Sequence, residues 1–111
     1  MFEFTLANGV AWVAVFVFMA GAIANWVAPP GMRAAYEHWG YPAGFHYVTS
    51  VAEFLAALLL SFPATRIAGA ALGGLVMAAA LGTVLYNREF THAVGPAIIG
   101  ALCACAGWLA L

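Results

Sequence analysis

Long apolar runs, separated by short polar or proline-containing segments, dominate the hydropathy pattern of this chain. The runs cover residues 9–27, 43–62, 67–86 and 93–111. A helix needs about 20 apolar residues to cross a hydrocarbon core about 30 Å thick, and each run is close to that length. A membrane barrel would instead require alternating strands of about ten residues, which these uninterrupted runs do not contain. The pattern therefore predicts an all-α fold, a single domain made of four transmembrane helices.

The segment between the first two runs is too long for a simple turn. Pro30 suits the first turn of a helix and Gly40 suits the position after its end, so residues 32–39 are predicted to form a short helix. Tyr36 and Trp39 would share its less polar face, which is typical of a helix lying in the membrane interface. An ordered loop with an aromatic anchor is the alternative.

The composition supports a membrane location. Hydrophobic residues make up 67% of the 111 residues and charged residues only 6%, with a formal net charge of −1 and no lysine. Soluble domains carry about 25% charged residues, so a water-soluble globular fold, a disordered chain and a nucleic-acid binder are excluded. We expect a multi-pass protein of the bacterial inner membrane. The first and third loops contain Arg33 and Arg88, whereas the opposite side contains only Arg66. This difference favours a cytoplasmic location for the first and third loops.

Small residues recur along the third run. One row consists of Ala70, Gly74, Ala78 and Gly82, and a parallel row consists of Gly69 and Gly73. This spacing lets helices approach closely in lipid, either inside one bundle or between copies in a homo-oligomer. Cys103 and Cys105 point to different sides of the fourth run and lack the spacing of a redox pair, so they are interpreted as packing residues.

Glu53 is the residue of the second run that most needs an explanation. It lies about 15 Å along the helix from the start of the run, near the bilayer midplane. A charged carboxylate there costs several kcal/mol, so the group should be protonated, hydrogen-bonded or in contact with water. His46, Ser50 and Glu53 fall at i, i+4 and i+7, which places them in one polar stripe.

Other polar and aromatic residues are predicted to gather at the same end of the bundle. They are Asn25, Trp26, Trp39, Tyr41, Tyr86, Asn87 and His92. This asymmetry predicts a cavity that opens toward the first and third loops, with Glu53 at its floor. The alternatives are a structural carboxylic acid at Glu53, a ligand-free interfacial His46, ordinary helix caps and an aromatic belt. No metal site is predicted, since the histidines lack compact ligand spacing, although a haem held by one histidine stays open.

Several motifs resemble a known family. They are Trp39-Gly40-Tyr41-Pro42, Glu53, Leu58-Leu59-Leu60-Ser61-Phe62-Pro63, Arg66 with Gly69, and Met77-Ala78. Between about Ala35 and Leu81 the chain resembles the DoxX-like family of small four-helix membrane proteins, and its outer helices match in hydropathy only. The resemblance carries over Tyr41, Pro42, Glu53 and Pro63, with Glu53 as the functional candidate. It implies a membrane partner or subunit of an oxidoreductase, including thiosulfate:quinone systems, and a quinone as the possible cofactor.

Two functions from different classes follow, and whether the chain is an enzyme stays open. The first is a subunit or partner of a redox system that binds a quinone-like or other lipophilic molecule. The second is a cofactor-independent membrane enzyme, an isomerase, cyclase or epoxide-opening hydrolase, with Glu53 as general acid or base. His46 or Tyr41 would be its second proton carrier. A channel or transporter is less favoured, because four helices would need further assembly and only one acidic residue lies deep.

Overall fold

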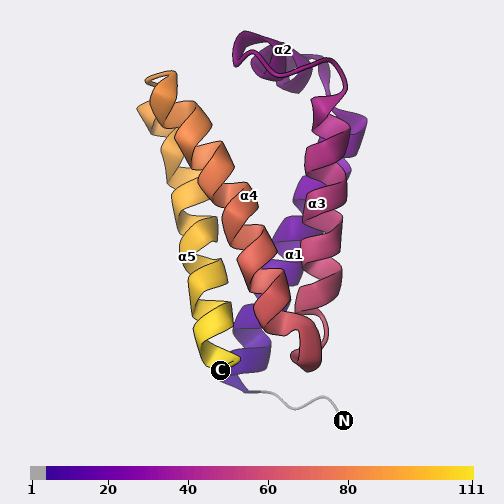
Figure 1. Cartoon of the computed structure of the whole chain (residues 1–111), viewed down its shortest axis with the longest axis vertical. Coiled ribbons are helices and arrows are strands. Elements are labelled where there is room, and N and C mark those ends of the chain that lie inside the picture. The colour runs from indigo at the N-terminus through magenta and orange to yellow at the C-terminus, as the bar shows by residue number, and fades with distance from the viewer. Residues whose placement is uncertain (1–4) are drawn as a thin grey trace.

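The computed structural model describes residues 5–111 as a helical bundle, and no strand occurs in this range (Figure 1). Its α-helices are α1 (Leu6–Val27), α2 (Pro30–His38), α3 (Phe45–Leu60), α4 (Arg66–Tyr86) and α5 (Val94–Leu109), with 3-10 turns η1 (Pro63–Thr65) and η2 (Phe90–Ala93). The predicted all-α class is confirmed. The four long helices lie within a few residues of the four apolar runs, and the short helix expected between the first two runs is α2.

Three helical segments are long and apolar enough to cross a membrane: Leu6–Val27, Pro63–Tyr86 and Phe90–Leu109. The fourth, α3, is apolar but has 16 residues and is shorter than the predicted run. Its end has a local cause. Phe62 precedes a proline and is extended, with φ −115° and ψ 128°, because the proline ring disfavours helical geometry in the residue before it.

The connection around α2 uses the expected turn residues. Pro30 occupies the first turn of α2, where its missing N–H leaves no hydrogen bond unmade. Gly40 and Gly44 have φ values of 86° and 80°, a left-handed conformation that favours glycine. The two glycines therefore allow the chain to reverse sharply between α2 and α3.

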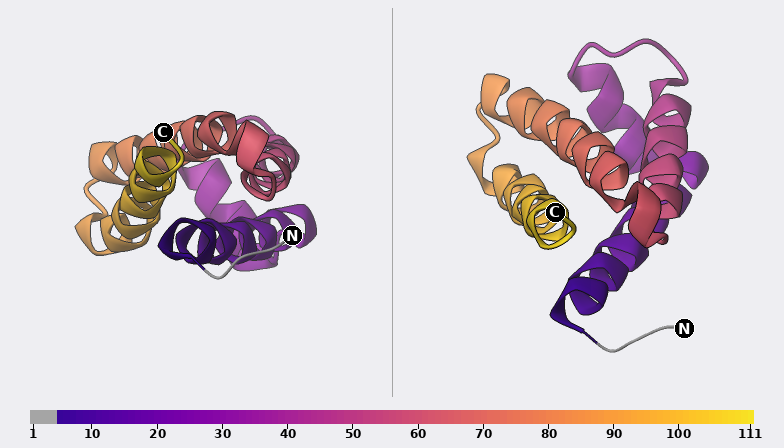
Figure 2. Two further views of the ribbon diagram at one scale, coloured as in Figure 1. Left: turned by 90° about the horizontal axis from the view of Figure 1, so that it is seen from below. Right: turned by 60° about the horizontal axis from the view of Figure 1, so that its bottom comes forward.

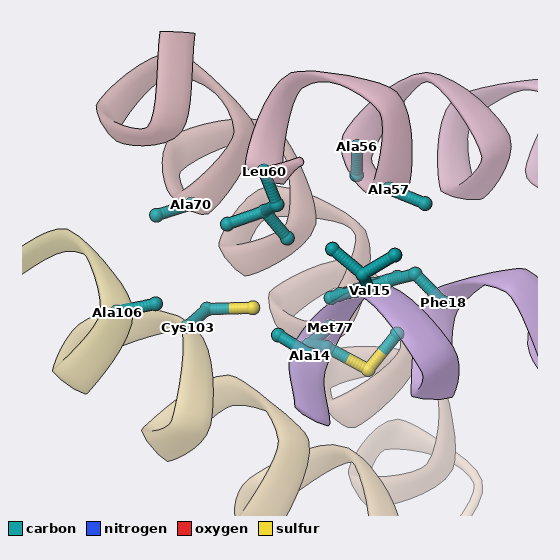
Figure 3. Close-up of a cluster of buried hydrophobic side chains, with 10 residues drawn as sticks. All are labelled: Ala14, Val15, Phe18, Ala56, Ala57, Leu60, Ala70, Met77, Cys103 and Ala106. Carbon is teal, nitrogen blue, oxygen red and sulfur yellow. The ribbon is translucent and has the colours of Figure 1, made fainter. Parts of the chain in front are cut away.

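The four long helices form a ring in which α1 contacts α3, α3 contacts α4, α4 contacts α5, and α5 contacts α1 (Figure 2). The hydrophobic core lies inside this ring (Figure 3) and consists of Ala14, Val15, Phe18, Ala56, Ala57, Leu60, Ala70, Met77, Cys103 and Ala106. Leu60 ends α3, Ala70 lies in the first half of α4 and Ala106 near the end of α5. The core therefore occupies the half of the bundle that holds the C-terminus, and its many alanines let the helices approach closely.

Arg66 holds the helices together at the end of the bundle near the C-terminus, which is here called the closed end. Its side chain is buried, its Nε donates to the Leu60 carbonyl at 3.0 Å, and its Nη1 donates to Asn8 Oδ1 at 3.0 Å. The three residues belong to α4, α3 and α1. A buried cation is costly unless its donors are used, so these bonds fix how the three helices meet.

The Gly69–Gly73 row of α4 packs inside the bundle, whereas the other row contributes only Ala70 to the core. A Cβ atom at Gly73 would approach the Phe18 ring to 2.7 Å, and one at Gly69 would approach the α3 backbone to 2.7 Å. A Cβ atom at Gly74 or Gly82 would meet nothing within 4 Å. The Gly69–Gly73 row thus provides the close contact within the chain, and self-association through the other row stays a prediction.

Toward α2 the bundle opens. Figure 1 shows the α4–α5 pair leaning away from the α1–α3 pair as the helices rise from the closed end, with α2 lying across the top. The space between the two pairs is where the structure places the candidate site.

Candidate functional site

A cavity of about 600 Å³ lies beneath α2, between the α1–α3 pair and the α4–α5 pair. Most of its wall is aliphatic or aromatic. The polar side chains that line it are Asn25, Tyr36, Trp39, Tyr41, Thr49, Glu53, Thr83 and His92. A largely apolar cavity of this size with a few converging polar groups is typical of small-molecule sites.

Glu53 provides the deepest polar group in the cavity wall. Its side chain is only 6% exposed, and its Oε1 accepts a hydrogen bond of 2.7 Å from the Asn25 amide. Gly21 of α1 faces the carboxyl group, and a Cβ atom there would overlap Glu53 Oε2. The absence of a side chain at Gly21 therefore makes the space in which the carboxyl group lies.

The Asn25 side chain joins three helices. Its Nδ2 donates to Glu53 and, at 2.9 Å, to the Gly21 carbonyl, while its Oδ1 accepts from the Tyr36 hydroxyl at 2.6 Å. Both amide hydrogens are thus used and the amide orientation is fixed by its partners. A continuous chain of hydrogen bonds runs from Tyr36 in α2 through Asn25 in α1 to Glu53 in α3.

Tyr36 belongs to α2, outside the apolar spans, and its side chain is half-buried between α2 and the rest of the bundle. Burial raises the pKa of its hydroxyl above the ordinary value of 10.0, against an opposing effect of the Thr49 hydroxyl. The phenol consequently stays neutral throughout the physiological range and keeps the hydrogen that it donates to Asn25. This neutral donor anchors α2, the helix that forms the roof of the cavity, to the hydrogen-bonded chain of Asn25 and Glu53.

His46 and Ser50 are buried beside Glu53 but point toward α1 instead of the cavity. The His46 Nδ1 lies 2.8 Å from the Asn25 carbonyl, and because a carbonyl only accepts, the nitrogen carries the hydrogen. The Ser50 hydroxyl donates to the Ala22 carbonyl at 2.6 Å. Both side chains therefore fasten α3 to α1, and neither lines the cavity.

Tyr41 closes the cavity on the side of α4. Its hydroxyl is hydrogen-bonded to the Thr83 hydroxyl, and Thr83 donates its own hydrogen to the Ala79 carbonyl at 2.8 Å, so Tyr41 is the donor between them. The Tyr41 ring stacks on Phe45, with ring centres 4.6 Å apart. The hydrogen bond to Thr83 therefore links the segment after α2 to the α4 wall of the cavity, and the ring stacking links it to α3.

Glu89 forms a second link, between the end of α2 and the turn that joins α4 to α5. Its Oε1 accepts a hydrogen bond of 3.0 Å from the Trp39 indole, which follows α2. His38 Nε2 lies 3.6 Å from Oε2 and His92 Nδ1 lies 3.6 Å from Oε1. The turn between α4 and α5 is thus connected to the roof through one carboxylate.

The structure brings together half of the residues predicted for the site. Asn25, Trp39, Tyr41, Glu53 and His92 line the cavity, whereas His46, Ser50, Trp26, Tyr86 and Asn87 do not. Trp26 packs on Tyr47 outside the bundle, with ring centres 4.7 Å apart. Tyr86 is 88% exposed, and Asn87 donates to the Thr83 carbonyl at 2.8 Å, at the end of α4.

Four polar residues at the site are not among those predicted from the sequence: Tyr36, Thr49, Thr83 and Glu89. The sequence predicts that the face of α2 that carries Tyr36 is directed at the membrane interface, but in the structure this face covers the cavity. Thr49 adjoins the predicted stripe, so its place next to Glu53 on α3 was the available signal. Thr83 and Glu89 reach the site only through the packing of α4, for which the sequence offered no signal.

Within residues 5–111 the structure contains no cluster of metal ligands and no pair of bonded cysteines. In this range, no group of three His, Cys, Asp or Glu side chains is arranged to hold a metal ion. Cys103 is buried in the core and Cys105 is exposed, as expected from their spacing. The chemistry that the site offers comes from hydroxyl, amide and carboxyl groups.

Long apolar helices around a largely apolar cavity with a few polar groups are typical of a small membrane protein. The sequence matches the DoxX-like family over residues 9–106, and the chain belongs to this family. The resemblance seen in the central motifs is therefore confirmed and extends over both outer helices. Comparison with curated proteins and with solved structures gives no match.

Proposed function

We propose that this protein crosses the bacterial inner membrane four times, with α2 lying at the membrane surface. In addition to the three long apolar segments, α3 also spans the membrane, because it packs between α1 and α4 and runs alongside them. Its 16 residues extend about 24 Å at about 1.5 Å per residue, a mismatch that local thinning of the bilayer accommodates. Arg33 and Arg88 lie at the α2 end, which supports a cytoplasmic location for that end.

The cavity, we infer, binds a quinone-like or other lipophilic molecule with its oxygen-bearing end at Glu53. The observation that carries this proposal is a single buried carboxyl group, held by Asn25, in a wall that is mostly apolar. A protonated Glu53 would donate to a carbonyl oxygen of the ligand, and the stacked rings of Tyr41 and Phe45 offer a flat aromatic surface. Apolar walls with one or two directed polar groups are what such a ligand needs.

The redox role that the family implies would require a second protein. A quinone supplies electron transfer when bound, and the residues of this cavity would position its head and exclude water. We therefore propose that an oxidoreductase docks at the α2 end, where the cavity lies closest to the membrane surface. In this arrangement the chain is the quinone-binding subunit.

Binding of decylubiquinone, measured by native mass spectrometry of the detergent-purified protein, tests the ligand proposal. Glu53→Leu should weaken binding about tenfold to a hundredfold, because it removes a hydrogen bond and leaves buried polar groups unpaired. Glu53→Gln keeps an acceptor for Asn25 and a donor for the ligand, so it should bind within a few-fold of wild type. Glu37→Gln, on the exposed side of α2, is the matched control. Equal binding by wild type and Glu53→Leu would contradict the proposal.

A second candidate is a cofactor-independent enzyme that acts on an apolar substrate. The observation in its favour is that Glu53 and Tyr41 both line the cavity, where the carboxyl group could act as general acid or base and the phenol as a second proton carrier. The same variants separate the two functions. An enzyme should lose turnover of terpenoid or epoxide substrates in Glu53→Gln while still binding them, whereas a binding subunit should turn over none.

A further inference from the structure

One open flank of the cavity lies between α3 and α4. Val48 on α3 is 57% exposed and Leu75 on α4 is 69% exposed, and both also line the cavity. Ala52 and Ala79 follow them by one helical turn on the same edges and line the cavity as well. These four residues form the rim of a side opening. A residue that lines the cavity and is also exposed on the outer surface lies at the edge of the cavity wall.

The end under α2 is held shut by three cross-links. Tyr36 donates to Asn25 of α1, Tyr41 is bonded to Thr83 of α4, and Trp39 donates to Glu89 beyond α4. Each bond joins the roof to a different part of the bundle. A molecule that enters at this end would have to break them, whereas one that arrives from the hydrocarbon through the side opening would not.

We propose that the opening between α3 and α4 is a lateral portal, and that the ligand is an amphiphile with a compact oxygen-bearing head and one long apolar tail. The head lies at Glu53 and the tail leaves past Ala52 and Ala79 into the bilayer. This inference rests on the proposed function of the cavity and deepens it by naming the ligand class. The four residues of this opening are apolar, which suits a hydrocarbon chain.

The rim residues have the sizes that a portal requires. Because α3 and α4 run in opposite directions, Ala52 and Ala79 lie along the opening between Val48, which is nearer to α2, and Leu75, which is farther from it. The methyl groups of the two alanines leave room for a tail between α3 and α4, and a phenyl ring at either position would occupy that space without reaching the site of the head at Glu53. The neighbouring Ala78 is exposed and does not line the cavity, so the same substitution there leaves the opening unchanged.

The experiment compares two probes with the same benzoquinone head, one carrying a decyl tail and one carrying none. Ala79→Phe should weaken binding of the tailed probe about tenfold or more, because its clash with the tail must be relieved. The tailless probe should bind Ala79→Phe and wild type within about twofold, a difference of a few tenths of a kcal/mol. Ala78→Phe should bind both probes as wild type does, and Ala52→Phe supplies an independent variant on the opposite rim.

The possible results separate this inference from the proposed function. If the tailed probe binds in a manner that depends on Glu53 but is indifferent to Ala79→Phe and Ala52→Phe, the portal is wrong and the binding site stands. Equal loss of both probes in the rim variants also overturns the portal, because the substitutions would then act on the head. Failure of wild type to bind either probe overturns both proposals.

Discussion

Gly21 and Glu53 form the most specific single contact in the site. The glycine lies on α1 where any side chain would overlap the carboxyl group of α3. Asn25, one turn later on α1, donates to both the Gly21 carbonyl and Glu53, so the same stretch of helix supplies the space and the hydrogen bond. The position of the carboxyl group therefore depends on a missing methyl group as much as on a donor.

Gly21→Ala should destabilise the protein by about 1–3 kcal/mol, the usual cost of forcing a methyl group into a packed site. Gly9→Ala on the same helix meets nothing within 4 Å and should stabilise it by up to about 1 kcal/mol through helix propensity. Unfolding of purified protein in mild detergent, followed by tryptophan fluorescence, measures both. Adding Glu53→Ala to Gly21→Ala should recover part of the loss, and strictly additive effects would show that the two residues do not touch.

The roof helix α2 is held by side chains more than by its own packing, since none of its residues is fully buried. Tyr36 and Trp39 connect it to α1 and to the turn after α4. A nine-residue helix is too short to be stable alone, so these contacts decide whether it stays closed over the cavity. Its mobility should therefore respond to changes in Glu89, which lies outside α2.

Glu89→Ala should accelerate hydrogen exchange of the α2 amides about tenfold, because a hydrogen bond to a charged acceptor contributes about 1.5–3 kcal/mol. The exchange of α3 near Leu60 should stay unchanged, since that region belongs to the closed end. Glu37→Ala removes a carboxylate from the exposed side of α2 and serves as the control. Hydrogen–deuterium exchange in nanodiscs measures the effect, and equal acceleration by the two variants would show that Glu89 does not hold the roof.

Helical periodicity predicted which face of α3 is polar but not which neighbour that face meets. His46, Ser50 and Glu53 are all buried, as their spacing indicates. Two of them bond to carbonyls of α1, and only Glu53 also reaches the cavity. The difference arises from the angle between α1 and α4 around α3, which tertiary packing sets. For the same reason hydropathy predicted the long helices closely, while Tyr36 and Thr83 could not be placed from sequence.

The molecule as a whole is closed at one end and open at the other, and this asymmetry creates the cavity. At the closed end, alanines and glycines bring α1, α4 and α5 together, and Arg66 bonds α4 to α3 and α1. At the other end the pairs diverge beneath α2 (Figure 1). The divergence can persist only if the closed end resists separation, so the stability of the fold should depend on the small residues there.

Gly73 and Gly74 are adjacent residues that test this dependence. Gly73→Ala would press on Phe18 and Cys103 where α1, α4 and α5 meet, and should cost about 1–3 kcal/mol of unfolding free energy. Gly74→Ala meets open space and should cost nothing, or gain up to about 1 kcal/mol. Thermal unfolding in one detergent compares the pair. If Gly74→Ala is the more harmful, light scattering should show a loss of oligomer, and the outer row of α4 would then be the contact between copies.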